Sequence, residues 1–269
     1  MTLAPPRRAI PGLGVEGIGW RQCRNYPEEA APRLAVSAAT PTPAPRDVLH
    51  VASFNIEMGR RVAAALEVVQ AHPVLAGADV LTVQEVDESA VERLAGALGM
   101  HAVYRASTVH PRTGRNFGSA ILTRWPIVDD GPLWLPGRGW VRGMRRLAVR
   151  ATIAVHARPV HVYNLHLSTM WEMTMAGQDR QARAVAEEAA GLAEPVIVTG
   201  DFNRRGAVRE LLRAGFHWHT RRVGPTHHVW SFDHVLSRGL GPGGGAGAVR
   251  EALRASDHRA VWAEVPAPA

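Results

Sequence analysis

Six short polar segments lie at or beside the ends of predicted β-strands, and their side chains are of the types that bind ligands and move protons. Each contains a carboxylate, an amide or an imidazole; the segments are 53–57, 82–86, 164–168, 199–203, 232–235 and 256–258. Ligand sites of α/β proteins form at the carboxyl ends of strands. Asn, Asp and Gly are also ordinary turn residues, so one such segment alone favours a turn. Six segments together favour a functional site.

The elements that must position these side chains follow from the apolar pattern. Short apolar runs predict strands, and the spacing of Val62, Leu66 and Val69 is typical of a helix. Helices between strand clusters, with consecutive strands in the middle of the chain, indicate an α/β protein with mixed sheets. The Gly-rich segment 239–247 is expected to be a flexible loop. We expect strands at 48–54, 80–83, 117–122, 127–133, 147–155, 160–165, 196–199, 232–236 and 258–265, and helices at 62–70, 91–98, 174–193 and 205–214.

The chain divides into two parts of different composition. Residues 1–46 contain eight prolines and no sustained periodicity, which is typical of an extension. We interpret them as an N-terminal extension that ends in the Pro-rich linker 40–45. An arm that docks on a partner is the alternative interpretation. We expect residues 47–269 to form the folded domain.

Composition excludes several classes of protein. The only cysteine, Cys23, leaves no intrachain disulfide and no Cys-based zinc site. The chain has no secretory h-region and no apolar run of ~18 residues, so we expect no membrane span and a cytoplasmic location. All 31 basic residues are arginine, and the net charge of +7 is compatible with a polyanionic partner without requiring one. Neither a Gly-x-Ser-x-Gly elbow nor a Walker A run occurs.

Taken in order, the polar segments resemble the motifs of the endonuclease/exonuclease/phosphatase superfamily, which includes deoxyribonuclease I, exonuclease III, sphingomyelinases and inositol-phosphate phosphatases. The resemblance extends from residue 48 to residue 265. It implies that 47–269 is a catalytic domain. The implied fold is a four-layered α/β sandwich, in which two packed mixed β-sheets are flanked by helices. The matching motifs are Phe54-Asn55-Ile56, Gln84-Glu85-Val86, Asn164-Leu165-His166, Gly200-Asp201-Phe202-Asn203, Phe232-Asp233-His234-Val235 and Ser256-Asp257-His258, with 118–124 similar to the family's central strand.

The resemblance implies a site for a divalent cation, Mg²⁺ with Mn²⁺ as an alternative. Glu85 would be the principal carboxylate ligand, Asn55 would supply an amide oxygen, and Asp257 would complete this side of the site. Mg²⁺ is suited to such a site because it takes one or two carboxylates together with waters and phosphate oxygens. Glu57 is an additional candidate ligand, because the period of two directs it to the same strand face as Asn55.

The remaining motif residues are implied to carry the chemistry of phosphodiester hydrolysis. Asp233 would orient His258, which would act at the scissile phosphate. Asp201 would align or deprotonate the attacking water, and Asn203 would bind a phosphate oxygen. His166 would stabilise the phosphate or act as an acid. Which group is the general base, and whether one or two metal ions act, stays open.

The function implied is that of a divalent-metal-dependent phosphodiesterase, in first place a monomeric nuclease that uses in-line attack by water. Exonuclease III-like enzymes tend to have tyrosine where this chain has His166, whereas deoxyribonuclease I and sphingomyelinases have histidine. Only 30 residues separate Asn203 from Asp233, which leaves little room for a long recognition insertion. Two alternatives therefore stay open: a phosphoesterase for a lipid, in the manner of sphingomyelinases, or for a small-molecule phosphate. A non-enzymatic binding module is the least favoured.

Four further features have both a functional and a structural interpretation. The histidines 217, 219, 227 and 228 lack the spacing of a zinc site, so we do not expect one. The arginines 138, 142, 145 and 146 could hold a phosphate backbone, but a solvated loop is favoured. Trp171 and the neighbouring methionines could form an apolar lip for a lipid or a base, or begin a helix. His234 is expected on the face of its strand opposite to Asp233.

Overall fold

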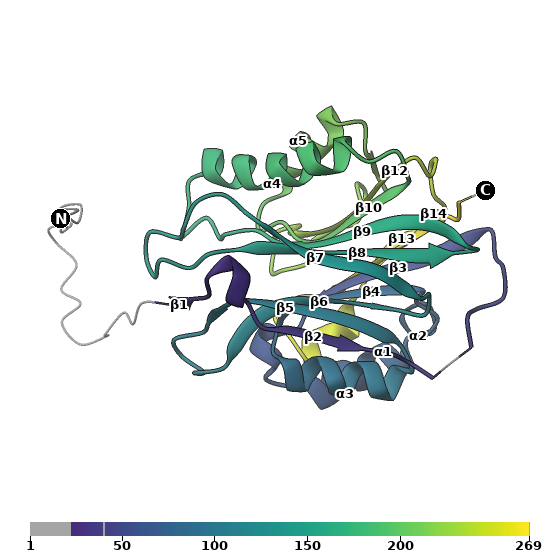
Figure 1. Cartoon of the computed structure of the whole chain (residues 1–269), viewed down its shortest axis with the longest axis horizontal. Helices are drawn as coiled ribbons and strands as arrows, with labels where there is room; N and C mark the ends of the chain where they lie inside the picture. The colour runs from purple at the N-terminus through teal and green to yellow at the C-terminus, as the bar shows by residue number, and fades with distance from the viewer. Residues whose placement is uncertain (1–22, 40, 269) are drawn as a thin grey trace, which may run out of the picture.

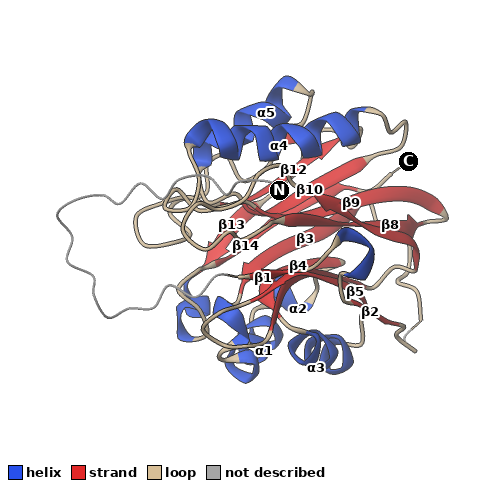
Figure 2. Ribbon diagram, turned by 60° about the vertical axis from the view of Figure 1, so that its left-hand side comes forward, coloured by secondary structure: helices blue, strands red, loops and turns tan. Residues whose placement is uncertain are grey.

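A computed structural model describes residues 23–39 and 41–268 of the chain. Two β-sheets pack face to face, and helices cover the outer face of each (Figure 1). The same four layers are visible after the molecule is turned by 60° (Figure 2). The predicted four-layered α/β sandwich is thereby confirmed.

The first sheet contains eight strands and both parallel and antiparallel neighbours. β3 and β4 are parallel, whereas the other pairs are antiparallel. In spatial order the strands are β1 (Arg24–Asn25), β5 (His101–Val109), β6 (Asn116–Thr123), β4 (Val80–Val86), β3 (Val48–Asn55), β14 (Ala260–Pro266) and β13 (Ala246–Val249), and β2 (Arg33–Val36) also pairs with β5.

The second sheet contains six strands and is also mixed, because β9 and β10 are parallel. In spatial order it consists of β11 (His217–Trp218), β12 (Asp233–Arg238), β10 (Val196–Asp201), β9 (Arg158–His166), β8 (Leu147–Val155) and β7 (Ile127–Trp134).

Helices α1 (Val62–Ala71), α2 (Pro73–Ala76) and α3 (Glu88–Leu98) cover the first sheet, and α4 (Met175–Ala190) and α5 (Val208–Arg213) cover the second (Figure 1). Short 3₁₀ turns lie at Glu28–Ala30, Glu57–Gly59, Arg205–Ala207 and Arg250–Arg254. α3 begins where the Asp87 side chain accepts a hydrogen bond from the Ala90 amide. It ends at Gly99, whose φ of 62° favours glycine. Within the described ranges, no helix is both long and apolar enough to cross a membrane.

The main core lies between the two sheets. Val51, Val80 and Ile121 of the first sheet face an apolar cluster that also contains Val149 and Val162 of the second. Because side chains alternate between the faces of a strand, the other buried residues of each sheet pack against its helices. The removal of this apolar surface from water is the main driving force that holds the layers together.

Three parts of the first sheet differ from the sequence expectation. β5 was not predicted, because Arg105, Ser107 and Thr108 interrupt its apolar pattern. β13 begins inside the segment expected to be a flexible loop, where backbone pairing with β14 holds it. β1 and β2 lie within the predicted extension and pair with β5. The boundary between residues 46 and 47 stays a prediction.

A buried hydrogen-bond network joins the two sheets. Asn164 of β9 donates from Nδ2 to the carbonyl oxygens of Val83 (2.9 Å) and Ala120 (2.8 Å) in the first sheet. Its Oδ1 accepts a hydrogen bond of 2.7 Å from Gln84 Nε2. Gln84 donates from the same nitrogen to Ser53 Oγ. The amides in two of the recognised motifs therefore bridge the sheets.

We expect Asn164→Ala to lower the free energy of unfolding by about 2 to 4 kcal/mol, because it leaves buried donors and acceptors without partners. Urea denaturation followed by circular dichroism measures this change. The control is Gln70→Ala on the exposed side of α1, which should change the free energy by less than about 0.5 kcal/mol. Equal stabilities of the two variants would contradict a bridging role for Asn164.

Candidate active site

A cavity of about 430 Å³ opens where strands of both sheets end. Glu85 lies near the end of β4, and His166 and Asp201 are the last residues of β9 and β10. Asn203, Asp257 and His258 also line the cavity. Asn55 and Asp233 are buried and hydrogen-bonded to this set. The structure therefore brings all eight predicted site residues together.

Two local backbone features direct the carboxylates into the cavity. A Cβ at Gly200 would lie 2.0 Å from the Leu165 carbonyl oxygen, so only glycine lets β10 pass so close to β9. This pairing places Asp201 beside His166 in register. Glu85 has a φ of 59° and lies at a β-bulge between Gln84 and Val86. A bulge re-aims the side chain, which explains why a strand residue can face the end of the sheet.

His258 lies between two buried carboxylates. Its Nδ1 is 2.9 Å from Asp233 Oδ2, and its Nε2 is 3.8 Å from Asp201 Oδ2. Although burial alone would lower the pKa of His258, the charges of Asp233 and Asp201 raise it to about 10. The imidazole is therefore charged at neutral pH, and the carboxylate of Asp233 determines its orientation.

Asn55 joins the two sheets inside the site. Its Nδ2 donates to Asp201 Oδ2 at 3.0 Å and to Glu85 Oε1 at 3.3 Å, while its Oδ1 accepts from the Glu57 amide at 3.1 Å. In this orientation the amide nitrogen faces the carboxylates. A direct contact of the amide oxygen with a cation, as the resemblance implies, requires a rotation of the Asn55 side chain. Burial raises the pKa of both Glu85 and Asp201 above its ordinary value.

His166 is held by an arginine that the sequence analysis did not place in the site. Arg146 Nη1 lies 3.1 Å from His166 Nδ1, and Arg146 Nη2 donates to Glu172 Oε2 at 3.1 Å. Burial lowers the pKa of His166 well below its ordinary value, and the charges of Arg146 and His258 add to this effect. Arg146 can only donate, and its Nη1 lies closer to His166 Nδ1 than to Nε2 (3.1 against 3.4 Å), which favours the tautomer with the proton on Nε2. That nitrogen is 3.6 Å from Asp201 Oδ2.

The expectation that the arginine run is a solvated loop is wrong for Arg146, which is 5% exposed. Arg145 is also partly buried: it stacks over Trp134 and pairs with Glu28. Arg138, by contrast, is exposed. One signal was present in the sequence, because Arg146 directly precedes the apolar run 147–155 that predicts a strand.

Asn203 and Asp257 complete the predicted set. Asn203 has a φ of 51°, and its backbone N–H donates a hydrogen bond of 2.7 Å to Asp201 Oδ1. Asp257 Oδ2 lies 3.5 Å from His227 Nε2. Although burial opposes it, the hydrogen bond from His227 and the charge of His258 lower the pKa of Asp257 to about 2. Asp257 is therefore a permanent carboxylate at the cavity wall.

Aromatic side chains line the cavity, and two of them were noted in the sequence: Trp171 as part of a possible apolar lip, and Phe232 as part of a motif. His227, Trp230 and Phe232 come from the segment before β12, and Trp171 comes from the segment before α4. Sequence reasoning did not identify Trp230 as a cavity residue, and its only signal was its position just before the motif Phe232-Asp233. His234 points away from this set and packs on Phe202 and Trp218, as expected.

The donor set suits a hard divalent cation. Glu85 and Asp257 are close enough for the charge of Asp257 to raise the pKa of Glu85, and no lysine or arginine forms an ion pair with either in the described part of the chain. Asp233 Oδ1 is buried and has no hydrogen-bond partner among the residues that the structure describes. Glu57 does not line the cavity, because Arg60 and Arg61 bind its carboxylate.

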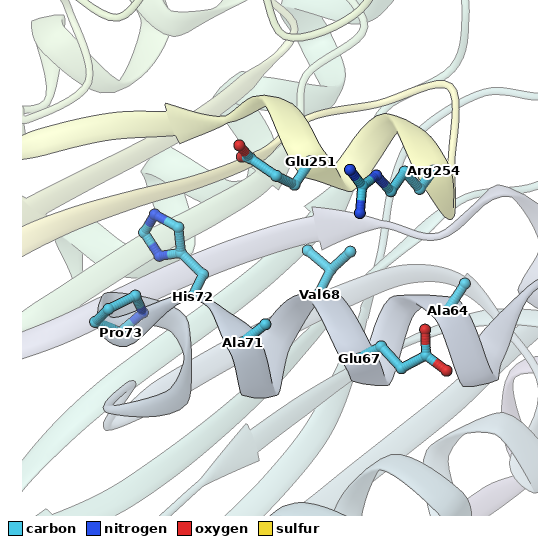
Figure 3. Close-up of a pocket in the computed structure, with 8 residues that line it drawn as sticks. All are labelled: Ala64, Glu67, Val68, Ala71, His72, Pro73, Glu251 and Arg254. Atoms are coloured by element: carbon cyan, nitrogen blue, oxygen red, sulfur yellow. The ribbon is translucent and has the colours of Figure 1, made fainter.

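A second cavity, of about 440 Å³, lies between α1 and the 3₁₀ turn near the C-terminus (Figure 3). Glu67, Glu251 and Arg254 lie around a mostly apolar lining that includes Val68. Among residues 23–39 and 41–268, two groups of three side chains could hold a metal ion, and both lie at the first cavity without including Glu85: His227, Asp257 and His258, and Asp201, Asp233 and His258. The chemistry is therefore assigned to the first cavity.

Solved structures share this fold. An endonuclease/exonuclease/phosphatase family protein from Bacteroides thetaiotaomicron is 21% identical, with 82% of this chain and 98% of that chain covered and a TM-score of 0.64. D. rerio TDP2 complexed with single strand DNA product is 16% identical, with 82% and 99% covered and a TM-score of 0.67. A B. thetaiotaomicron mannosyl-6-phosphatase is 21% identical, with 81% and 99% covered and a TM-score of 0.63.

Comparison of the amino-acid sequence with known proteins and with family models agrees with the comparison of structures. Among curated proteins, none matches the chain significantly. A family model described as the Endonuclease/Exonuclease/phosphatase family matches residues 52–258, which include every residue of the site. Motifs, geometry, fold and family model agree, and the chain belongs to the endonuclease/exonuclease/phosphatase family.

Proposed function

We propose that the protein is a divalent-metal-dependent phosphodiesterase that hydrolyses nucleic acid by in-line attack of water. Phosphoester hydrolysis is the chemistry of its family. The observation that carries the proposal is the charged His258, held by Asp233 at 2.9 Å beside the buried Asp201. Phosphoryl transfer depends on positioning and on stabilising negative charge, and this arrangement supplies both.

In this proposal each side chain has one task. Asp201 accepts the proton of the attacking water, because burial raises its pKa and so makes it a better base than an exposed aspartate. The water oxygen then forms a bond to phosphorus as the bond to the leaving oxygen breaks. His258 donates a hydrogen bond to a phosphoryl oxygen and carries the compensating positive charge. His166 donates a hydrogen bond to the phosphate from Nε2, and Asn203 donates one to a phosphate oxygen from its side-chain amide.

Glu85 and Asp257 would hold the cation. When bound, a divalent cation would neutralise the charge that develops on the phosphoryl and leaving oxygens. Mg²⁺ is the first candidate and Mn²⁺ the second, because Glu85 and Asp257 offer carboxylate oxygens, the donors that these cations prefer. The monomeric state and the cytoplasmic location expected from the sequence stay predictions.

A second candidate function is hydrolysis of a small-molecule or lipid phosphate. A cavity of about 430 Å³ has the size of a small-ligand pocket. One of the solved structures with this fold is a mannosyl-6-phosphatase. Nucleic acid is favoured over these substrates by the exposed aromatic side chains at the cavity, on which bases can stack.

The first test is the nicking of supercoiled plasmid with Mg²⁺. We expect the wild type to nick and a chelator to abolish nicking. His258→Ala should lower the rate roughly 10²- to 10³-fold, as expected for the loss of one preorganised donor that stabilises transition-state charge. His217→Ala, at an exposed position outside the cavity, is the control and should retain full activity.

Nicking that survives in His258→Ala would contradict the assigned mechanism. If neither DNA nor RNA is cleaved, whereas a sugar phosphate or sphingomyelin is hydrolysed, the second candidate function replaces the first. Hydrolysis of none of these substrates would contradict the enzymatic proposal as a whole.

The charge of His258 also predicts how stability depends on pH. Because its pKa of about 10 in the folded protein exceeds the ordinary value of 6.5, its stabilising contribution is complete below pH 6.5 and is lost as pH rises towards 10. In the presence of a chelator, the free energy of unfolding should therefore fall across this interval. Each unit by which the pKa of His258 differs between the folded and unfolded states contributes at most about 1.4 kcal/mol to the free energy of unfolding.

Asp233→Asn removes the main charge that raises this pKa. We expect its unfolding free energy, measured by urea denaturation, to fall less steeply than that of the wild type between pH 6.5 and 10. Identical slopes for the two proteins would mean that Asp233 does not hold His258 in its charged form.

A further inference from the structure

Two tryptophans at the mouth of the catalytic cavity are exposed to an unusual degree. Trp171 is 78% exposed and Trp230 is 54% exposed, and both line the cavity. Large apolar side chains that are exposed around a site are typical of a surface that binds a ligand or another molecule. Met170 lines the cavity beside Trp171, and Val229 is exposed beside Trp230.

Both indoles stand on backbone that is held in place. The amides of Thr226 and His227 donate to the Trp230 carbonyl oxygen, and the Trp230 amide donates to the His227 carbonyl oxygen. Trp140 Nε1 donates to the Trp171 carbonyl oxygen at 2.8 Å. The two segments are therefore preorganised, so binding of a ligand would not require them to become ordered first.

Planar rings continue from Trp230 towards the reacting centre. The rings of Trp230 and Phe232 are 6.4 Å apart with an interplanar angle of 4°. The ring centroids of Phe232 and His227 are 5.4 Å apart, with an interplanar angle of 18°. The ring centroid of His227 lies 4.6 Å from that of His258. A wall of nearly parallel rings suits a flat ring of the ligand better than it suits a flexible acyl chain.

In the part of the chain that the structure describes, exposed arginines without carboxylate partners lie close in sequence to Trp230 and to Trp140, whose indole bonds to the Trp171 carbonyl oxygen. Arg138 lies two residues from Trp140, and Arg221 and Arg222 precede the turn that holds Trp230. All three are exposed, and within the described ranges none of them forms an ion pair. Exposed guanidinium groups can hold the phosphates of a strand whose bases stack on aromatic rings.

We propose that Trp171 and Trp230 are stacking platforms for unpaired bases, so that the substrate is single-stranded nucleic acid with its scissile phosphate at His258. The inference rests on the proposed nuclease function. In a duplex the bases are stacked inside the helix and cannot lie on an indole. A strand without base pairs can place one base on each tryptophan while its phosphates face the cavity and the arginines.

The test measures binding without catalysis. A fluorescent 12-nucleotide single strand, the duplex of the same sequence and a 12-unit strand of abasic sites are titrated with the protein in a chelator. We expect the single strand to bind at least tenfold more tightly than the duplex. Trp171→Ala and Trp230→Ala should each weaken binding of the single strand about 5- to 100-fold. Neither variant should change binding of the abasic strand, which retains the phosphates but lacks bases.

Two further variants exclude trivial causes. Trp230→Phe retains a planar ring and should recover most of the affinity that Trp230→Ala loses. Leu212→Ala, which truncates an exposed apolar side chain on α5 outside the cavity, should leave binding unchanged. Thermal denaturation of each variant verifies that it is folded.

Equal affinity for single strand and duplex, with no effect of either tryptophan, would overturn the inference. So would loss of binding to phosphatidylcholine vesicles in the tryptophan variants with unchanged oligonucleotide binding, because the surface would then bind lipid. Tryptophan-dependent binding of the single strand without any hydrolysis would refute the nuclease function alone. Hydrolysis that is independent of both tryptophans would refute only the stacking platforms.

Discussion

The site depends on buried hydrogen bonds that cross from one sheet to the other. Asn164 bonds to Gln84 and to backbone carbonyls of the facing sheet, and Asn55 bonds to Asp201. A buried polar group without a partner costs free energy, so the two sheets are most stable in the packing that pairs these amides. That packing brings the carboxylate of Glu85 and that of Asp201, which come from different sheets, to one cavity.

Within this frame, two histidines of the same chemical type take opposite protonation states. The pKa of His258 is raised because Asp233 and Asp201 lie beside it, whereas burial, with the charges of Arg146 and His258, lowers the pKa of His166 and keeps it neutral. Different neighbours thus assign different tasks to equal side chains. In our proposal His258 balances negative charge on the phosphate, and His166 is a neutral donor.

Much of the fold was predictable because the buried strands are apolar runs. β3 and β10 are examples, and the period of α1 was equally clear. β5 was missed because its polar residues conceal a strand that is buried through its neighbours. β13 was missed because backbone pairing with β14, rather than side-chain pattern, holds a glycine-containing edge strand.

The sequence by itself determined the types and the order of the motif residues, and with them the family. It could not reveal that Arg146 bonds to His166, or that Trp230 and Phe232 continue the ring series to His258. Only the tertiary structure decided these contacts, and it also decided which groups are charged. The physical reason is that periodicity is a local property of the chain, whereas burial and electrostatic interaction depend on distances between residues that are far apart in sequence.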